Sequence, residues 1–121
     1  MFMVKAWNTV VETAMFAAKA AKLFSSDEIA AIVTMLSQNP ECGAVIPGAG
    51  GVRKVRVAAS GHGKSGGARV IYYFLNDGAP VYLFTVFAKN EKADLDKADL
   101  AAMSKAAAAI KAALQKKGQS K

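Results

Sequence analysis

Four basic residues in the second half of the chain, Lys54, Arg56, Arg69 and Lys89, are the side chains best suited to chemistry. Arginine can hold a phosphate through two parallel hydrogen bonds, whereas lysine supplies a point charge that can also change its protonation state. Preorganised cations of both kinds stabilise the negative charge that builds up on phosphate oxygens during phosphoryl transfer. These residue types therefore indicate a site for a phosphate-bearing polyanion.

The spacing of these residues predicts that neighbouring strands bring them together. Side chains alternate between the two faces of a strand, so Lys54 and Arg56 share one face. By the same rule Arg69 shares a face with Tyr73, and Lys89 ends the next strand-like run. If the three runs pair in order, the four cations converge on one surface. The competing interpretation is a set of solvated charges on an exposed sheet face.

A glycine-rich segment, GHGKSG at 61–66, lies between two of these runs and contains His62 and Lys64. It matches G-x-G-x-x-G, but a dinucleotide site needs a helix directly after the motif, and the strand-like ARVIYYF follows here. We expect residues 60–67 to be either a flexible connector or a hairpin loop that faces a phosphate. A lone loop histidine is more often an incidental exposed residue than an acid or base.

Composition places the chain among small intracellular proteins with a polyanionic partner. It has 121 residues, a net charge of +7 and 53% hydrophobic residues, and no acid lies between Gly43 and Asn76. This size and composition predict one domain, with residues 1–7 as an extension and 115–121 as a frayed basic tail. A single cysteine, Cys42, excludes an internal disulfide and a cysteine-based metal site. We expect no cofactor, no metal and a cytoplasmic location without membrane contact.

The pattern of apolar residues predicts an α+β fold. We expect a strand over 8–13, helices over 14–23 and from Ser25 to Asn39, strands over 52–58, 68–75 and 80–89, and a last helix capped by Asp96. Asp77-Gly78 predicts a tight turn between the last two strands. The sheet is antiparallel, mixed at its first strand, with two N-terminal helices and one C-terminal helix packed on it. Tyr73 is expected on its solvent side.

Three ordered blocks resemble the RelE/HigB toxins of bacterial toxin–antitoxin pairs, within the RelE/ParE superfamily. The blocks are IPGAGGVRKVR, GKSGGARVIYYF and LFTVFAKNEKADL, and the likeness covers roughly residues 9–100. The resemblance implies a RelE-like fold and a metal-free endoribonuclease that cleaves mRNA on the ribosome, so that translation and growth stop. It also implies a cognate antitoxin, of a kind that is often a helix-turn-helix DNA-binding protein.

The same resemblance implies roles for individual residues. Arg69 would grip the scissile phosphate, Lys54 and Arg56 would divide proton transfer and charge stabilisation, and Lys89 would close the last strand. The positions that it implies for further RNA contacts are Arg53, His62, Lys64, Tyr73, Asn90 and Lys92.

Two departures from the family pattern leave other functions open. In the best-known family member a second basic residue occupies the position of Asn90, and a later tyrosine stacks on a base, whereas no tyrosine follows Tyr82 here. The alternatives are a non-catalytic toxin on the same fold, such as a ParE-like gyrase inhibitor, and an inactive relative that binds nucleic acid through its charge. The variant Arg69→Ala would distinguish these functions, because it should change the mRNA ends made by a nuclease, whereas binding by overall charge depends little on which basic residue is removed.

Overall fold

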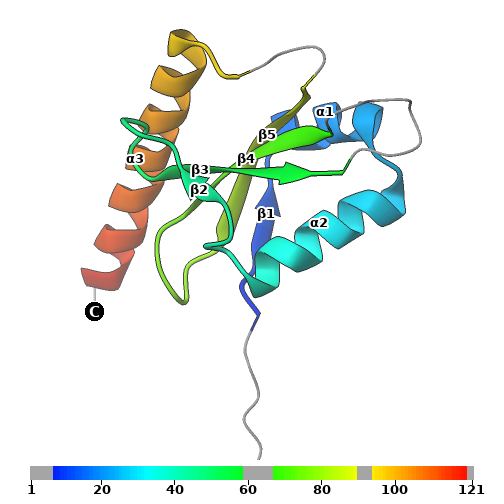
Figure 1. Ribbon diagram of the computed structural model, residues 1–121. Coiled ribbons are helices and arrows are strands. Elements are labelled where there is room, and N and C mark those ends of the chain that lie inside the picture. Colours follow the sequence, from blue (N-terminus) through cyan, green and yellow to red (C-terminus); the bar gives the residue numbers. More distant parts are fainter. Residues whose placement is uncertain (1–6, 59–66, 90–93, 120–121) are drawn as a thin grey trace, which may run out of the picture.

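A single mixed sheet forms the centre of the protein (Figure 1). The computed structural model describes residues 7–58, 67–89 and 94–119, with side chains as far as 116. The strand order is β1-β5-β4-β3-β2, with β1 parallel to β5 and the other neighbours antiparallel. This confirms the predicted α+β class and the sequential pairing of the three long strands. The strands are β1 (Val10–Glu12), β2 (Ala44–Val45), β3 (Val52–Val57), β4 (Ala68–Phe74) and β5 (Val81–Ala88).

Three helices cover the two faces of the sheet: α1 (Ala14–Leu23), α2 (Ser26–Gln38) and α3 (Lys97–Gln119). In Figure 1, α1 and α2 lie on one side and α3 on the other. The predicted bounds of α1 are confirmed, and α2 begins with the predicted capping box. The Ser25 hydroxyl accepts from the Glu28 N–H at 3.2 Å, and the Glu28 carboxylate accepts from the Ser25 N–H at 2.8 Å. Such a cap contributes about 1 kcal/mol of stability.

Helix α3 begins with a side-chain cap of the same kind as that of α2. The predicted cap is present, because the Asp99 N–H donates to the Asp96 carboxylate at 2.8 Å. The helix then continues to Gln119, through most of the segment for which we expected a frayed tail. Within the described ranges, no helix combines the length and the hydropathy that crossing a bilayer requires.

Burial on both faces of the sheet produces two separate apolar cores. Phe16, Leu36 and Tyr72 are fully buried members of the core between the sheet and α1 and α2. The other core lies under α3 and includes Ile71 and Phe87. Because both faces are covered, β4 and β5 are buried along nearly their whole length rather than at alternate residues.

The expected solvent-side position of Tyr73 is wrong. Tyr73 belongs to the core under α3, is only 3% exposed, and stacks on Phe84 with ring centroids 6.5 Å apart. Tyr72 and Tyr73 face opposite sides of the sheet, as the predicted alternation along β4 requires. The second face is not open to water, because the apolar stripe of α3 covers it.

A bulge in β5 decides which side chains of this strand face α3. Ile71 pairs with Thr85 and Tyr72 with Leu83, so Phe84 is the extra residue. The bulge allows Phe84 and Phe87, which are an odd number of residues apart, to share the core under α3. The bulge therefore decides which of the β5 residues after Phe84 face α3.

The connector between α2 and β3 contains an element that the sequence did not predict. We expected only turns from Cys42 to Gly51, but Ala44–Val45 form the edge strand β2 against β3. Beside it, the buried Gly43 N–H donates to the Tyr72 hydroxyl at 2.8 Å. A Cβ at Gly43 would lie 2.7 Å from that hydroxyl oxygen, so the close approach requires glycine. The Asp77-Gly78 turn is present, with the Ala79 N–H bonded to the Asn76 carbonyl and Gly78 at φ +90°.

Tyr72→Phe should destabilise the protein by about 1–3 kcal/mol, because it leaves the buried Gly43 N–H without an acceptor. The measurement is the free energy of unfolding from urea titration. The control is Tyr82→Phe, which removes a hydroxyl from a half-buried ring and should change stability by less than about 0.5 kcal/mol. Equal losses in the two variants would contradict a special role for the Tyr72 hydroxyl.

Alkaline conditions should weaken the fold through the same residue. Burial raises the pKa of Tyr72 from 10.0 to about 12, against the opposing effect of the Gly43 N–H. The folded state therefore holds this proton more tightly than the unfolded state. Its contribution is fully present below pH 10 and is lost as the pH rises towards 12. Unfolding free energies measured across this range should fall more steeply for the wild type than for Tyr72→Phe, and parallel curves would contradict the assignment.

Candidate functional site

Three of the predicted catalytic cations lie on one face of the sheet, at the end where β3 finishes and β4 begins. Arg56 pairs directly with Arg69 across the two strands, and Lys54 pairs with Ile71. Because Ile71 belongs to the core under α3, the alternation places all three cations on the α3 side of the sheet. Side chains directly opposite each other on antiparallel strands have Cβ atoms about 5 Å apart. We call Lys54, Arg56, Arg69 and the adjacent Lys89 the basic cluster.

The members of the basic cluster are reachable from solvent. Arg56 and Lys89 are exposed, Arg69 is half-buried, and the Lys54 side chain is 36% exposed. Water solvates the charges of exposed lysines and arginines, whereas an unpaired cation in the interior would be unstable. The cluster therefore has the accessibility that a bound phosphate requires.

Gly67 contacts the end of β5 at the edge of the sheet that carries the basic cluster. Its carbonyl accepts a hydrogen bond from the Lys89 N–H at 3.1 Å, and its own φ is +68°. A Cβ at this position would overlap the carbonyl oxygen of Val57 at the end of β3. Glycine therefore lets the last residue of β3, the first residues of β4 and Lys89 meet, which brings Lys89 beside the strand that carries Arg69.

The cluster includes an acid that the sequence analysis did not identify. Asp94, just before α3, places its carboxylate oxygens 3.2 and 3.4 Å from the Lys54 ammonium. The Leu95 N–H, followed by Lys54 and Arg69, lowers the pKa of the Asp94 carboxyl, so this group is an anion at neutral pH. No local motif marks Asp94, because the two partners are 40 residues apart in the chain.

Arg53 lies apart from the basic cluster. It pairs with Tyr72, whose side chain faces α1 and α2, so Arg53 is on the opposite side of the sheet. Its guanidinium donates to the Gly43 carbonyl at 2.7 Å and to the Glu41 carbonyl at 3.1 Å. These contacts hold the connector that carries β2, so Arg53 is positioned as a structural residue and not beside the cluster predicted to bind RNA.

The remaining predicted RNA contacts divide into two groups. Tyr73 is covered by α3, so its ring face is not open to a base in this structure. His62, Lys64, Asn90 and Lys92 lie outside the described residues.

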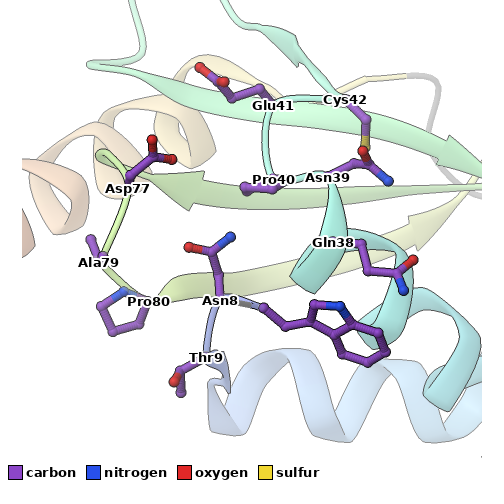
Figure 2. Close-up of a pocket in the computed structure, with 12 residues that line it drawn as sticks. Asn8, Thr9, Gln38, Asn39, Pro40, Glu41, Cys42, Asp77, Ala79 and Pro80 are labelled. Carbon is purple, nitrogen blue, oxygen red and sulfur yellow. The ribbon is translucent and has the colours of Figure 1, made fainter. Parts of the chain in front are cut away.

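A wide groove of about 700 Å³ lies at the other end of β4 and β5. Figure 2 shows Asn8 between Pro40 on one side and Ala79 and Pro80 on the other. The twelve described residues that line it include Glu41 and Asp77 but neither lysine nor arginine. Its chemistry suits a phosphate poorly, and the β4–β5 pairing separates it from Arg69 by the length of the strands.

Candidate metal ligands are dispersed in the part of the chain that the structure describes. Those residues contain no group of three or more histidines, cysteines or carboxylates arranged to hold an ion. The described site thus offers fixed cations and one carboxylate.

Comparison with known proteins agrees with this fold. Residues 9–120 match the family described as the RelE toxin of the RelE/RelB toxin–antitoxin system. A free-state structure of E. coli toxin RelE, a mutant with two arginines changed to alanine, is similar with a TM-score of 0.54 and 14% identity. The match covers 83% of this chain and 95% of the E. coli chain. At this identity the structural likeness establishes the fold, whereas the family match covers nearly the whole sequence.

Gly67→Ala should disturb the basic cluster by separating the strand ends. We compare it with Gly78→Ala, because both glycines have positive φ, but among the described residues no atom beyond its chain neighbours lies within 4 Å of a Cβ built at Gly78. The control should lose about 1 kcal/mol from backbone strain alone, whereas Gly67→Ala should lose at least about 2 kcal/mol. Urea unfolding measures both, and equal losses would show that contact with Val57 is unimportant.

Proposed function

Since this chain belongs to the RelE toxin family of RelE/RelB toxin–antitoxin systems, we propose that it is an endoribonuclease that cleaves mRNA on the ribosome. The observation that carries the proposal is the direct pairing of Arg56 with Arg69, beside Lys54 and at the solvent-accessible end of the α3 side of the sheet. A fold alone does not specify chemistry, because one fold can host many functions. The proposal therefore rests on the cluster.

The proposed reaction needs no metal. The ribose 2′-oxygen forms a bond to the adjacent phosphorus and loses its proton, while the bond from phosphorus to the 5′-oxygen breaks. The leaving 5′-oxygen takes up a proton, so the products are a 2′,3′-cyclic phosphate and a 5′-hydroxyl. Negative charge rises on the non-bridging oxygens in the transition state, and fixed cations stabilise it more than they stabilise the ground state.

Each member of the basic cluster has a proposed role that follows from its chemistry and position. Arg69 grips the scissile phosphate, because a guanidinium can donate two parallel hydrogen bonds. Arg56, directly opposite, contributes a second permanent charge. Lys54 can carry a proton as well as a charge. Lys89 adds a point charge where β5 ends, and its backbone is held by Gly67.

Membership of a toxin–antitoxin family implies an antitoxin partner. We propose that this partner is a helix-turn-helix DNA-binding protein and that its binding prevents the basic cluster from reaching RNA. An acidic surface on the antitoxin would complement the exposed Arg56 and Lys89. Ribosome dependence is also part of the proposal, and its support is the family alone.

Arg69→Ala should reduce mRNA cleavage by about a hundredfold, because one preorganised donor to the developing charge contributes about that much. The measurement is the mapping of new mRNA 5′ ends in a reconstituted translation reaction, with and without ribosomes. Lys22→Ala is the matched control, since it removes one positive charge from an exposed position on α1. The control should cleave like the wild type.

Two results would contradict the nuclease. One is an identical set of mRNA ends for the wild type and Arg69→Ala. The other is growth arrest without any new ends, together with inhibition of supercoiling by purified gyrase, which would support the ParE-like alternative. Loss of RNA binding in equal measure for Arg69→Ala and Lys22→Ala would instead indicate binding by overall charge.

A further inference from the structure

The ion pair between Lys54 and Asp94 places an anion inside the basic cluster. Both carboxylate oxygens lie near the same ammonium, at 3.2 and 3.4 Å from Nζ. Arg69 adds a second attractive charge, since it helps to lower the pKa of this carboxyl. A bound phosphate would likewise present oxygens to Lys54, with Arg69 nearby. The Asp94 carboxylate therefore resembles the group that the basic cluster is proposed to bind.

The surroundings of Asp94 show that this contact can be broken at low cost. Its side chain is 61% exposed and that of Lys54 is 36% exposed, so water can solvate both ions after they separate. An exposed ion pair changes an equilibrium constant by no more than about fivefold. A phosphate that contacts several cations at once can therefore displace the carboxylate. A weakly held polyanion makes fewer such contacts, so displacing the carboxylate stabilises its binding less.

The covalent position of Asp94 gives it a second property. It is bonded directly to Leu95, whose side chain packs in the core under α3, and its carboxylate accepts from the Leu95 N–H at 2.8 Å. The acid therefore stays close to the basic cluster even when it releases Lys54. Its effective concentration at Lys54 is that of an intramolecular competitor rather than of a free anion in solution.

We propose that Asp94 competes with the RNA phosphate for Lys54, so that RNA binds only by displacing this carboxylate. The inference rests on the proposed function, because it assigns the basic cluster to RNA. It adds Asp94 as a residue that weakens RNA binding, in contrast to the cations around it. RNA must then bind tightly enough to displace this carboxylate.

The test is the dissociation constant of a short fluorescein-labelled oligoribonucleotide in which every 2′-hydroxyl is methylated, measured by anisotropy at physiological ionic strength. This probe cannot be cleaved, so the result does not depend on nuclease activity. Asp94→Asn keeps an oxygen that can accept from the Leu95 N–H but removes the charge that holds Lys54. We expect this variant to bind about threefold to fivefold more tightly than the wild type.

Two controls separate local competition from a general gain of positive charge. Asp77→Asn makes the same change in net charge at the far hairpin, which lies beyond the screening length of about 8 Å from the cluster, and should alter binding less than twofold. Lys54→Met removes the group for which Asp94 competes. Adding Asp94→Asn to Lys54→Met should therefore tighten binding much less than adding it to the wild type.

The outcomes are distinct. Tighter binding by Asp94→Asn, with both controls as stated, supports competition at Lys54. Binding no tighter than that of Asp77→Asn, or an equal gain in the Lys54→Met background, overturns it. Weaker binding or slower cleavage by Asp94→Asn, with an unchanged unfolding free energy, would instead make Asp94 a residue that positions Lys54. A failure of mRNA cleavage would overturn the nuclease but would leave this binding result intact.

Discussion

The register between β3 and β4 is the constraint on which the rest of the structure depends, because it forces Arg56 and Arg69 to lie opposite each other. Like charges in this arrangement repel and destabilise a sheet. The register is nevertheless fixed by burial. A slip of one residue would exchange the two faces of β4, moving Arg69 into the core that holds Val70 and Tyr72. Apolar packing thus holds together two cations that would otherwise separate.

Coverage of both sheet faces explains why this concentration of charge is confined to one end. The helices α1 and α2 bury one face, and α3 buries most of the other. The cations occupy the part of the α3 face where Arg56 and Lys89 remain exposed. Water solvates them there, and glycine at position 67 lets the three strand ends approach closely enough to collect them. A rigid, two-sided core with a solvated cationic end is well suited to hold a phosphate in one geometry.

Asp94 changes how the charge of the cluster should be understood. The segment from Gly43 to Asn76 contains no acid, so the sequence suggests an unrelieved positive patch. The fold supplies the carboxylate of Asp94, just before α3, 3.2 Å from the Lys54 ammonium. An internal anion reduces repulsion among the cations in the free protein and, in the competition that we propose, is displaced by the RNA phosphate.

The sequence by itself determined most of the elements and the common face of Lys54 and Arg56. Capping at Ser25 and Asp96, the Asp77-Gly78 turn and the alternation of strand residues are local effects that neighbouring residues specify. It could not show that Tyr73 is buried, that β2 exists, or that Asp94 reaches Lys54, because each depends on contacts between distant segments. Which helix covers a face, and which acid meets a cation, follow from the packing of the whole chain, and only the tertiary structure decides them.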